Sequence, residues 1–456
     1  MKAVVCALVF LVLTVETPEF ARDKFHTFMV YAQPLFKGNP LNLWDVCVGL
    51  VALAVALNPR TWRDAVKPLN QALVAALLMV ALAVAWGGLR HGDLRMAYFQ
   101  LHAFLRVFLL VPLLAAVFRS TRDLKLLAMT ILAGAVYRAI GCVLAMRLSI
   151  IGSRDEWPTD VTGHDDSAIW AAAIVGLLGW LLIQPRLRTA LVVGLLAPVI
   201  LLAIHYNNRR LAWVEIAGSL LLLYLFLPRG PVRRRLTRLT LAVAPVLVLY
   251  VAVGWGRSGT LFAPVAKIRS VVADDNNASN LARDLEDMGL VFTLQNHRLL
   301  GTGFGQQYEE ISMVYTKGMQ RTFGIYRYIP HNSVLGLAAF TGLLGFPVIW
   351  AFMAVGAFLA ARAYRLARSL AEQALAQVAF LSLFIYGQQA FGDMGFVSLK
   401  VNLLLACALA IAGRLAILTG AWPARRARSY GAVTRGPRVR VGPTSAPVLA
   451  RARTSS

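Results

Sequence analysis

Long apolar stretches alternate with short polar ones along almost the whole chain. Most are about 20 residues long, the length of helix that crosses the roughly 30 Å hydrocarbon core of a bilayer. The pattern therefore predicts an all-α polytopic membrane protein with about twelve transmembrane helices. The expected spans are 2–16, 41–57, 68–87, 97–118, 124–146, 167–183, 188–205, 210–227, 236–254, 331–360, 369–389 and 396–417.

The polar connections differ between the two sides of this bundle. Every second connection is basic and, like the C-terminal end, contains almost no acid; Asp64 and Asp123 are the exceptions. Because basic loops stay on the cytoplasmic side, both termini are expected there and the other loops on the outer side. The basic residues are Arg60, Arg63, Lys67, Arg119, Arg122, Lys125, Arg186, Arg188, Arg229, Arg233, Arg234, Arg235, Arg238, Arg362, Arg365 and Arg368.

These spans divide the chain into four regions. Transmembrane helices 1–9 occupy 1–254, one large outer loop with short helices occupies 255–330, and transmembrane helices 10–12 occupy 331–420. Within the loop, ASNLARDLEDMGLVFTL (278–294) is expected to be helical. The remaining 421–456 is rich in Arg, Pro, Ser and Gly, which predicts a disordered basic cytoplasmic tail.

Composition supports the membrane assignment and narrows the partners. The chain is 58% hydrophobic and 15% charged, whereas soluble domains carry about 25% charged residues. A net charge of +24 would suit nucleic acid, but the basic residues lie in short patches between apolar stretches. Membrane lipids are therefore the expected partner, and nucleic acid is not. The four cysteines lack the spacing of a disulfide framework or a zinc site.

The stretch YIPHNSVLGLAAFTGLLGF (328–346) begins with polar residues at the outer end of an expected span. Pro330 suits the first turn of a helix, which places His331 and Asn332 beside free backbone N–H groups. Such a helix start favours anions. The alternative is that His331 is an interfacial residue satisfied by water.

Arginines occur at the outer side as well. Arg209 and Arg210 follow two asparagines at the start of span 210–227, where they either hold a phosphate or extend to lipid headgroups. The outer loop adds Arg283 and Arg327. Its Gly-x-Gly-x-Gly segment (301–305) lacks the strand and helix of a dinucleotide site, so a tight turn that closes the loop against the membrane is expected.

Two further arginines, Arg106 and Arg138, fall near the middle of their spans. A charge there costs at least about 2.5 kcal/mol, so each should face protein or a water-filled cavity. Asp45, Glu215 and Asp393 are candidate partners, although the sequence does not pair them. The chain has no Asp-x-Asp, metal-ligand cluster or nucleotide-binding loop, so we expect chemistry without metal or cofactor, based on arginines and one histidine.

Several of these segments resemble the bacterial O-antigen ligase and polymerase superfamily. RLLGTGFGQQY (298–308) followed by YRYIPHNSVLGLAAFTGLLGF (326–346) is similar to its glycine turn, His-Asn-Ser motif and Gly-Leu-Leu-Gly ending. NNRRLAW (207–213) resembles its Arg-x-x-Trp helix start, with Arg210 in register and Arg209 as the alternative. LARDLEDMGLVFTL (281–294) resembles the loop helix that carries a functional arginine, here Arg283. The detailed resemblance covers roughly 205 to 346.

The resemblance implies an inverting, metal-independent membrane glycosyltransferase similar to the GT-C class, with no cofactor. In the ligases, a glycan moves from undecaprenyl diphosphate to a sugar hydroxyl of lipid A–core, at the periplasmic face of the inner membrane. His331 would be the base, and Arg210 and Arg283 would act in catalysis. The residues expected to hold the diphosphate are Arg209, Arg210, Arg283, Arg327 and Asn332, with Arg138 and Asp393 as supporting residues.

Two rival functions remain open at this stage. An O-antigen polymerase would perform the same chemistry on an undecaprenyl-linked acceptor, and one dominant outer loop favours the ligase over it. A lipid-linked glycan flippase or other transporter would carry polar groups through its middle and on both faces. The polar groups here gather on one face, although Arg106 and Arg138 keep the transporter under consideration.

Overall fold

The computed structural model describes residues 1–14, 43–57, 67–152, 162–227, 229–257, 259–262, 265–266, 269, 278–311 and 327–422. The described residues form helices and turns, with no β-strand among them. Nearly all of the predicted tail (421–456) lies outside them. The helices are α1 (Lys2–Thr14), α2 (Leu43–Ala56), α4 (Asn70–Leu89), α5 (Leu94–Val117), α6 (Thr121–Gly152), α7 (Asp165–Ile183), α8 (Leu187–Tyr206), α9 (Arg210–Phe226), α10 (Pro231–Gly254), the 3₁₀ turn η2 (Thr260–Phe262), α12 (Ala278–Asn296), α14 (Ser333–Leu366), α15 (Leu370–Gly392) and α16 (Leu399–Leu418).

Nine of the twelve predicted spans are met by helices long and apolar enough to cross a membrane, counted over the described residues. These nine are α4, α5, α6, α7, α8, α10, α14, α15 and α16. The other three spans coincide with α1, α2 and α9, which have 13, 14 and 17 residues. The prediction of an all-helical polytopic membrane protein is therefore confirmed, whereas the count of twelve crossings remains a prediction.

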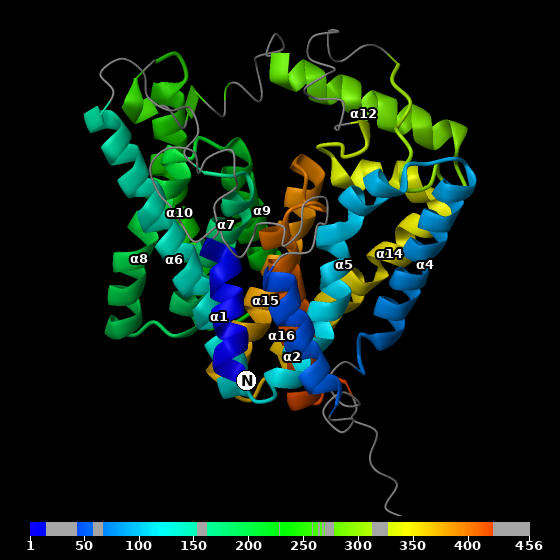
Figure 1. Cartoon of the computed structure of the whole chain (residues 1–456). Coiled ribbons are helices and arrows are strands. Elements are labelled where there is room, and N and C mark those ends of the chain that lie inside the picture. The colour runs from blue at the N-terminus through cyan, green and yellow to red at the C-terminus, as the bar shows by residue number, and fades with distance from the viewer. Residues whose placement is uncertain are drawn as a thin grey trace, which may run out of the picture. The chain divides into compact units, whose positions relative to one another are not determined.

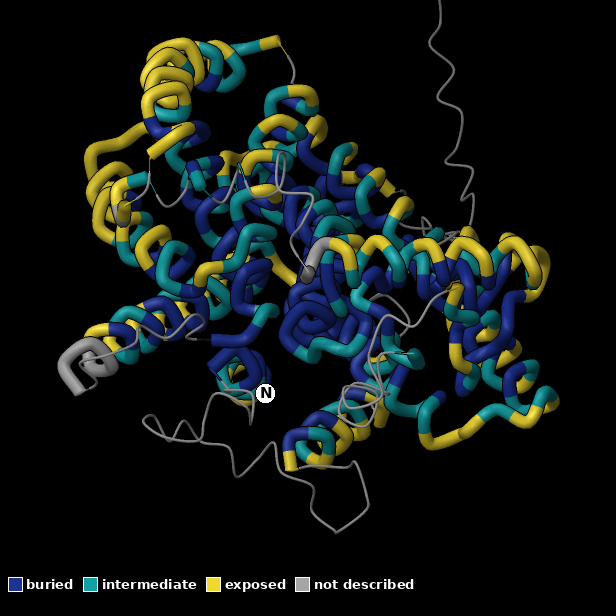
Figure 2. Tube along the Cα trace, turned by 90° about the horizontal axis from the view of Figure 1, so that it is seen from above, coloured by how far each residue is buried: buried dark blue, intermediate teal, exposed yellow. Residues whose placement is uncertain are grey.

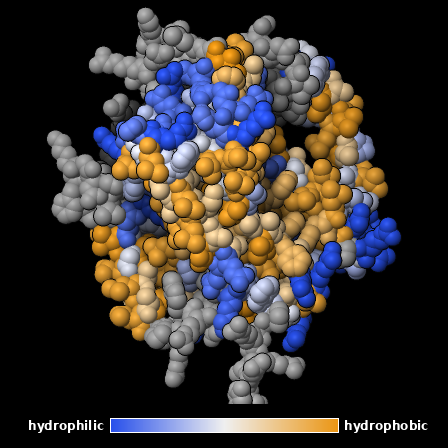
Figure 3. All heavy atoms as spheres, turned by 90° about the vertical axis from the view of Figure 1, so that its right-hand side faces the viewer, coloured by the Kyte–Doolittle hydropathy of each residue, from blue (hydrophilic) through white to orange (hydrophobic). Residues whose placement is uncertain are grey.

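Burial orders the helices from centre to edge. Of the most apolar 18 residues of α16, 89% are buried inside the protein, whereas only 6% are buried in the corresponding stretch of α10. Buried segments gather in the middle of Figure 2 and exposed ones at its periphery. On the face shown in Figure 3, a broad apolar band separates hydrophilic areas at two ends. This distribution suits helices that are surrounded by lipid.

The helix predicted at 278–294 is present as α12. It lies across one end of the neighbouring helices, transverse to them (Figure 1). Leu290 of α12 packs with Tyr308 and with Ala339 of α14 in a small apolar cluster. Through this contact the charged residues of α12 reach the start of α14.

Helix α14 is interrupted at Gly342, whose φ of 65° and ψ of −177° are not helical. The carbonyl oxygens of Ala339 and Phe340 accept from outside the helix at this point. Their donors are the N–H groups of Thr302 and Gly303, at 3.0 and 2.9 Å. The carbonyl groups beside the break in α14 thus accept the hydrogen bonds that hold the segment after α12.

The Gly-x-Gly-x-Gly segment forms the predicted tight turn. Gly301, Gly303 and Gly305 have φ of +67°, +86° and +87°, values that cost other residues about 1–2 kcal/mol. A Cβ on Gly303 would lie 2.3 Å from the backbone nitrogen of Gly87 in α4, and one on Gly301 would lie 2.4 Å from the carbonyl carbon of Phe340. Glycine is therefore required both for the conformation and for the close approach of the backbones.

We expect Gly303→Ala to destabilise the protein by at least about 3 kcal/mol, because strain of about 1–2 kcal/mol adds to a backbone overlap that separates the turn from α4. Gly420→Ala is the matched control, since Gly420 has φ +75° but open space around it. The free energy of unfolding of the control should fall only by the strain of about 1–2 kcal/mol. Thermal unfolding of the purified variants in detergent measures both, and equal losses would contradict the packing argument.

Candidate functional site

His331 pairs with an acid that the sequence analysis did not select. Its backbone N–H donates to Glu286 Oε1 at 2.5 Å, and its Nδ1 lies 3.0 Å from Glu286 Oε2. The Glu286 side chain is 2% exposed and that of His331 is 20% exposed. A carboxylate at Nδ1 holds the neutral ring in the tautomer whose lone pair is on Nε2. The pair therefore has the arrangement of a general base with an orienting acid.

Asn332 connects the same two helices. Its Oδ1 accepts from the Leu335 N–H at 3.0 Å, which caps α14, and its Nδ2 donates to Asp287 Oδ2 at 3.3 Å. Burial raises the pKa of Asp287 despite the Asn332 hydrogen bond, and the charges of Glu286 and Asp284 add to the rise. The side chain that was expected to hold a diphosphate is thus engaged in positioning α12 on α14.

Arg283 reaches the end of α15. Its Nη1 donates to the carbonyl of Gly392 at 3.2 Å. The first turn of α9 meets the same residue, because a Cβ on Gly392 would lie 2.7 Å from Leu211 Cδ1. Arg209 occupies the N-cap position of α9 and Arg210 is the first residue of this helix; both are partly exposed. Three arginines selected from the sequence therefore belong to elements that converge on the end of α15.

Asp393 lies at this point and is buried. His164 Nδ1 is 2.5 Å from Asp393 Oδ2, and the Met394 N–H donates to Oδ1 at 2.8 Å. Its backbone carbonyl accepts from Ser333 Oγ at 3.4 Å, next to the start of α14. Burial alone would raise the pKa of Asp393, but the hydrogen bond and charge of His164, the Met394 N–H and the Arg283 charge lower it below its ordinary value. Asp393 is therefore a buried ionised carboxylate within the site.

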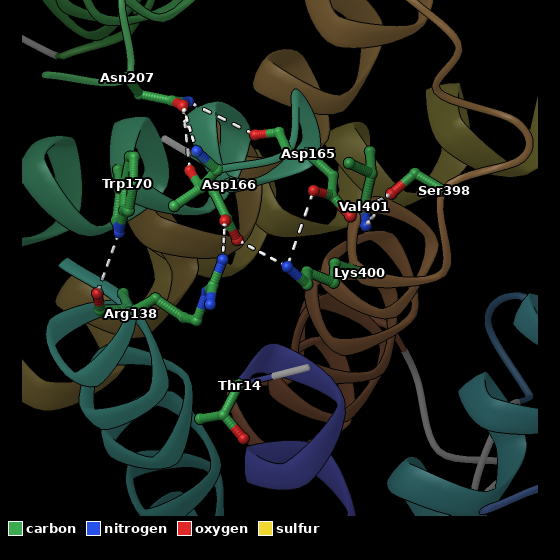
Figure 4. A network of polar contacts seen from close by, with 12 residues as sticks. Thr14, Arg138, Asp165, Asp166, Trp170, Asn207, Ser398, Lys400 and Val401 are labelled. Atoms are coloured by element: carbon green, nitrogen blue, oxygen red, sulfur yellow. Dashed lines mark hydrogen bonds and ion pairs between the residues drawn. The ribbon is translucent and has the colours of Figure 1, made fainter. Parts of the chain in front are cut away.

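Arg138 belongs to a buried network at the start of α7 (Figure 4). Its Nη2 lies 2.6 Å from Asp166 Oδ2, and Lys400 Nζ of α16 lies 2.8 Å from Asp166 Oδ1. Lys400 Nζ is also 3.7 Å from Asp165 Oδ1. Two acids and two bases are thus balanced inside the protein. Because His164 directly precedes Asp165, the network fixes the position from which His164 reaches Asp393.

Other charged residues have partners away from this point. Arg327, which we expected to hold a diphosphate, pairs with Glu310, and its role at a diphosphate stays a prediction. Arg106 binds Asp45 with both Nε and Nη2, at 2.7 and 2.8 Å. The expectation that the mid-span arginines face protein is thereby confirmed. Glu215 is fully buried, and neither carboxylate oxygen has a hydrogen-bond partner among the described residues.

An apolar groove of about 660 Å³ begins at this end of the bundle. It starts at Gly392 and Leu211 and follows α15 between α9 and α14 as far as Phe380 and Leu222. Along α15 this corresponds to about 18 Å at 1.5 Å per residue. The groove therefore connects the arginine-bearing helix ends with the membrane-facing part of the protein.

The sequence analysis did not select Glu286 or His164, although helix spacing could have indicated Glu286. Glu286 and Asp287 follow Arg283 by three and four residues, so a helix places all three on one face. No local pattern indicated His164, whose partner lies far along the chain. Among the residues that the structure describes, no three His, Cys, Asp or Glu side chains are grouped so as to hold a metal ion.

We expect Asp166→Ala to destabilise the protein by about 3–5 kcal/mol, because it removes the buried acid that Arg138 shares with Lys400 and leaves Lys400 only the longer contact with Asp165. Lys2→Ala is the control, because it breaks the ion pair of Lys2 with Asp123 and the Lys2 side chain is 50% exposed. The control should lower the free energy of unfolding by less than about 1 kcal/mol. Thermal unfolding midpoints report the difference, with Asp166→Asn as a less disruptive variant. Wild-type midpoints for both Asp166 variants would contradict a stabilising role for the network.

No protein-family model matches the chain, and none of the curated proteins matches its sequence.

Proposed function

We propose that this protein is a membrane glycosyltransferase of the O-antigen ligase type. It transfers a glycan from undecaprenyl diphosphate to a sugar hydroxyl of lipid A–core at the periplasmic face of a bacterial inner membrane. The reaction inverts the anomeric carbon and uses neither metal nor cofactor. Two findings support the proposal. They are the resemblance of the segment 205–346 to the ligase superfamily and the positions of the described residues of this segment in the structure.

One observation carries the proposal. Glu286 of α12 pairs with His331, two residues before α14, and Arg283 of the same helix α12 reaches Gly392 at the end of α15. A base for an acceptor hydroxyl and a cation for a leaving phosphate are therefore carried together at one end of the bundle. Glycosyl transfer from a lipid diphosphate requires these two functions.

The chemistry assigns a role to each group. His331 Nε2 takes the proton of the acceptor hydroxyl while the hydroxyl oxygen bonds to the anomeric carbon of the donor sugar. The bond from that carbon to the diphosphate oxygen breaks on the opposite side, and its electron pair leaves with the diphosphate. Glu286 stabilises the positive charge that the imidazole ring acquires. No oxidant, reductant or further reactant is needed.

The leaving group explains the arginines. Negative charge grows on the diphosphate as the bond breaks, and a guanidinium suits it because the planar group can donate two parallel hydrogen bonds to phosphate. Arg283, with Arg209 and Arg210 at the start of α9, supplies this charge. The apolar groove that begins at Gly392 suits the isoprenoid chain of the donor, which must remain in lipid while its diphosphate reaches the arginines.

The case for a transporter is weaker than the sequence alone suggested. It depended on Arg106 and Arg138, and both form ion pairs with acids of neighbouring helices. A ligase and a polymerase share the chemistry above and differ in the acceptor. Purified protein with undecaprenyl-diphosphate glycan, tested with lipid A–core and with a second lipid-linked glycan as acceptors in excess chelator, separates them.

We expect His331→Ala to reduce transfer by about 10²–10⁴-fold, because it removes the proposed general base, while donor binding changes little. The matched control is His91→Ala, an exposed histidine between α4 and α5. The control should retain wild-type transfer. Product formation is measured by gel shift of the lipid A–core, after membrane levels of each variant have been equalised.

Glu286→Gln serves as the second variant in this test. It keeps the shape of the orienting side chain but removes its charge, so transfer should fall and its pH profile should change. Near-normal transfer by His331→Ala, or an unchanged pH profile for Glu286→Gln, would exclude the proposed base.

We expect Arg283→Ala to weaken donor binding by about 10- to 100-fold, since a hydrogen bond to a charged group contributes roughly 1.5–3 kcal/mol. Arg283→Lys should restore little, because an ammonium lacks the planar fork. Arg298→Ala is the control, an exposed arginine of the same outer segment. Binding of fluorescent undecaprenyl diphosphate measures the effect, and equal affinities for all variants would remove Arg283 from the diphosphate site.

A further inference from the structure

A basic pocket lies where α9 ends and α10 begins, at the opposite end of these helices from Arg210. Its volume is about 440 Å³. The lining residues are Tyr224, Arg229, Gly230, Arg233, Arg234 and Thr237. Half of them are arginines, which makes this pocket different from the apolar groove beside α15.

The charges of the pocket arginines are the next feature. Among the described residues, no carboxylate forms an ion pair with Arg229, Arg233 or Arg234. Arg235, which does not line the pocket, is used differently, because its Nη1 donates to the carbonyl of Leu182 at 2.8 Å and attaches α10 to the end of α7. Three neighbouring positive charges around one space attract an anion.

One of the three arginines is held in position by the wall of the pocket. The Arg233 guanidinium carbon lies 4.6 Å from the centre of the Tyr224 ring. Thr237, one turn further along α10, donates from Oγ1 to the Arg233 carbonyl at 2.9 Å. A guanidinium fixed over an aromatic ring loses less conformational freedom when it binds a phosphate, and its planar donors match phosphate oxygens.

The helix beside the pocket is largely uncovered by the rest of the protein. The buried residues of α10 are Leu236 and Gly254. Only 6% of the most apolar 18 residues of this helix are enclosed by protein. Leucine and valine side chains cover the rest, with Leu241, Val246 and Val248 more than 60% exposed. An acyl chain can therefore run along α10 while its headgroup occupies the basic pocket.

We propose that this pocket binds the phosphate of an anionic phospholipid from the leaflet that borders this end of α10. Charge complementarity identifies the headgroup, and the apolar surface of α10 identifies a lipid as its source. Basic pockets between membrane helices are suited to such headgroups. The site is independent of the proposed glycosyl transfer. Because α10 leads into the outer loop, the bound lipid would anchor the helix that precedes this loop.

The test uses the full-length protein in a neutral detergent and native mass spectrometry to count bound lipids. The probes are phosphatidylglycerol, phosphatidylcholine and sodium phosphate. Arg229→Gln/Arg234→Gln removes two charges from the pocket but keeps the contact between Arg233 and Tyr224. Arg186→Gln/Arg188→Gln removes two exposed charges next to α7 and serves as the matched control.

We expect wild type and control to bind phosphatidylglycerol at least tenfold more tightly than phosphatidylcholine. The pocket variant should lose about fivefold per arginine, or about 25-fold in total. Equal loss in the control would reduce the effect to diffuse surface charge and overturn the site. Equal binding of the two lipids, or saturation by sodium phosphate that displaces phosphatidylglycerol, would overturn the assignment to an anionic lipid.

Discussion

The arrangement of the site depends on the ion pairs that the buried carboxylate of Asp166 forms with Arg138 and Lys400. A charge in an apolar interior costs several kcal/mol unless it is paired, and Asp166 provides the acid for both Arg138 of α6 and Lys400 of α16. It thereby fixes the first turn of α7 between two other helices. His164 precedes this turn, so its contact with Asp393 follows from the buried pair.

A second constraint acts on the backbone and places α12. The break of α14 at Gly342 frees carbonyl groups, and the glycine turn at 301–305 uses them at distances that exclude a Cβ. The segment 301–305 is consequently attached to α4 and α14 through main-chain contacts. With its end fixed in this way, α12 lies across the start of α14, and Glu286 reaches His331.

The charges of α12 are divided between two functions in the proposed reaction. Glu286 and Asp287 face the start of α14, where they bind His331 and Asn332, while Arg283 reaches the end of α15. One helix thus brings the acid that supports the base and the cation that supports the leaving group. At the other end of α9, three arginines that form no ion pair among the described residues line a pocket beside the weakly buried helix α10. The two proposals thus place a phosphate at each end of α9.

Local sequence was enough to predict nine helices of membrane-spanning length, the helix at 278–294 and the glycine turn at 301–305. These features depend on local periodicity, on backbone conformation and on the cost of exposing polar groups to lipid, which neighbouring residues decide. The partners of the charged side chains became visible only in the folded protein. Glu286 lies 45 residues from His331, and Asp166 lies 234 from Lys400. Arg327 was expected at the diphosphate and is paired with Glu310. Such pairings follow from how helices pack across the whole chain, and no local pattern specifies which acid will be within reach of a given base.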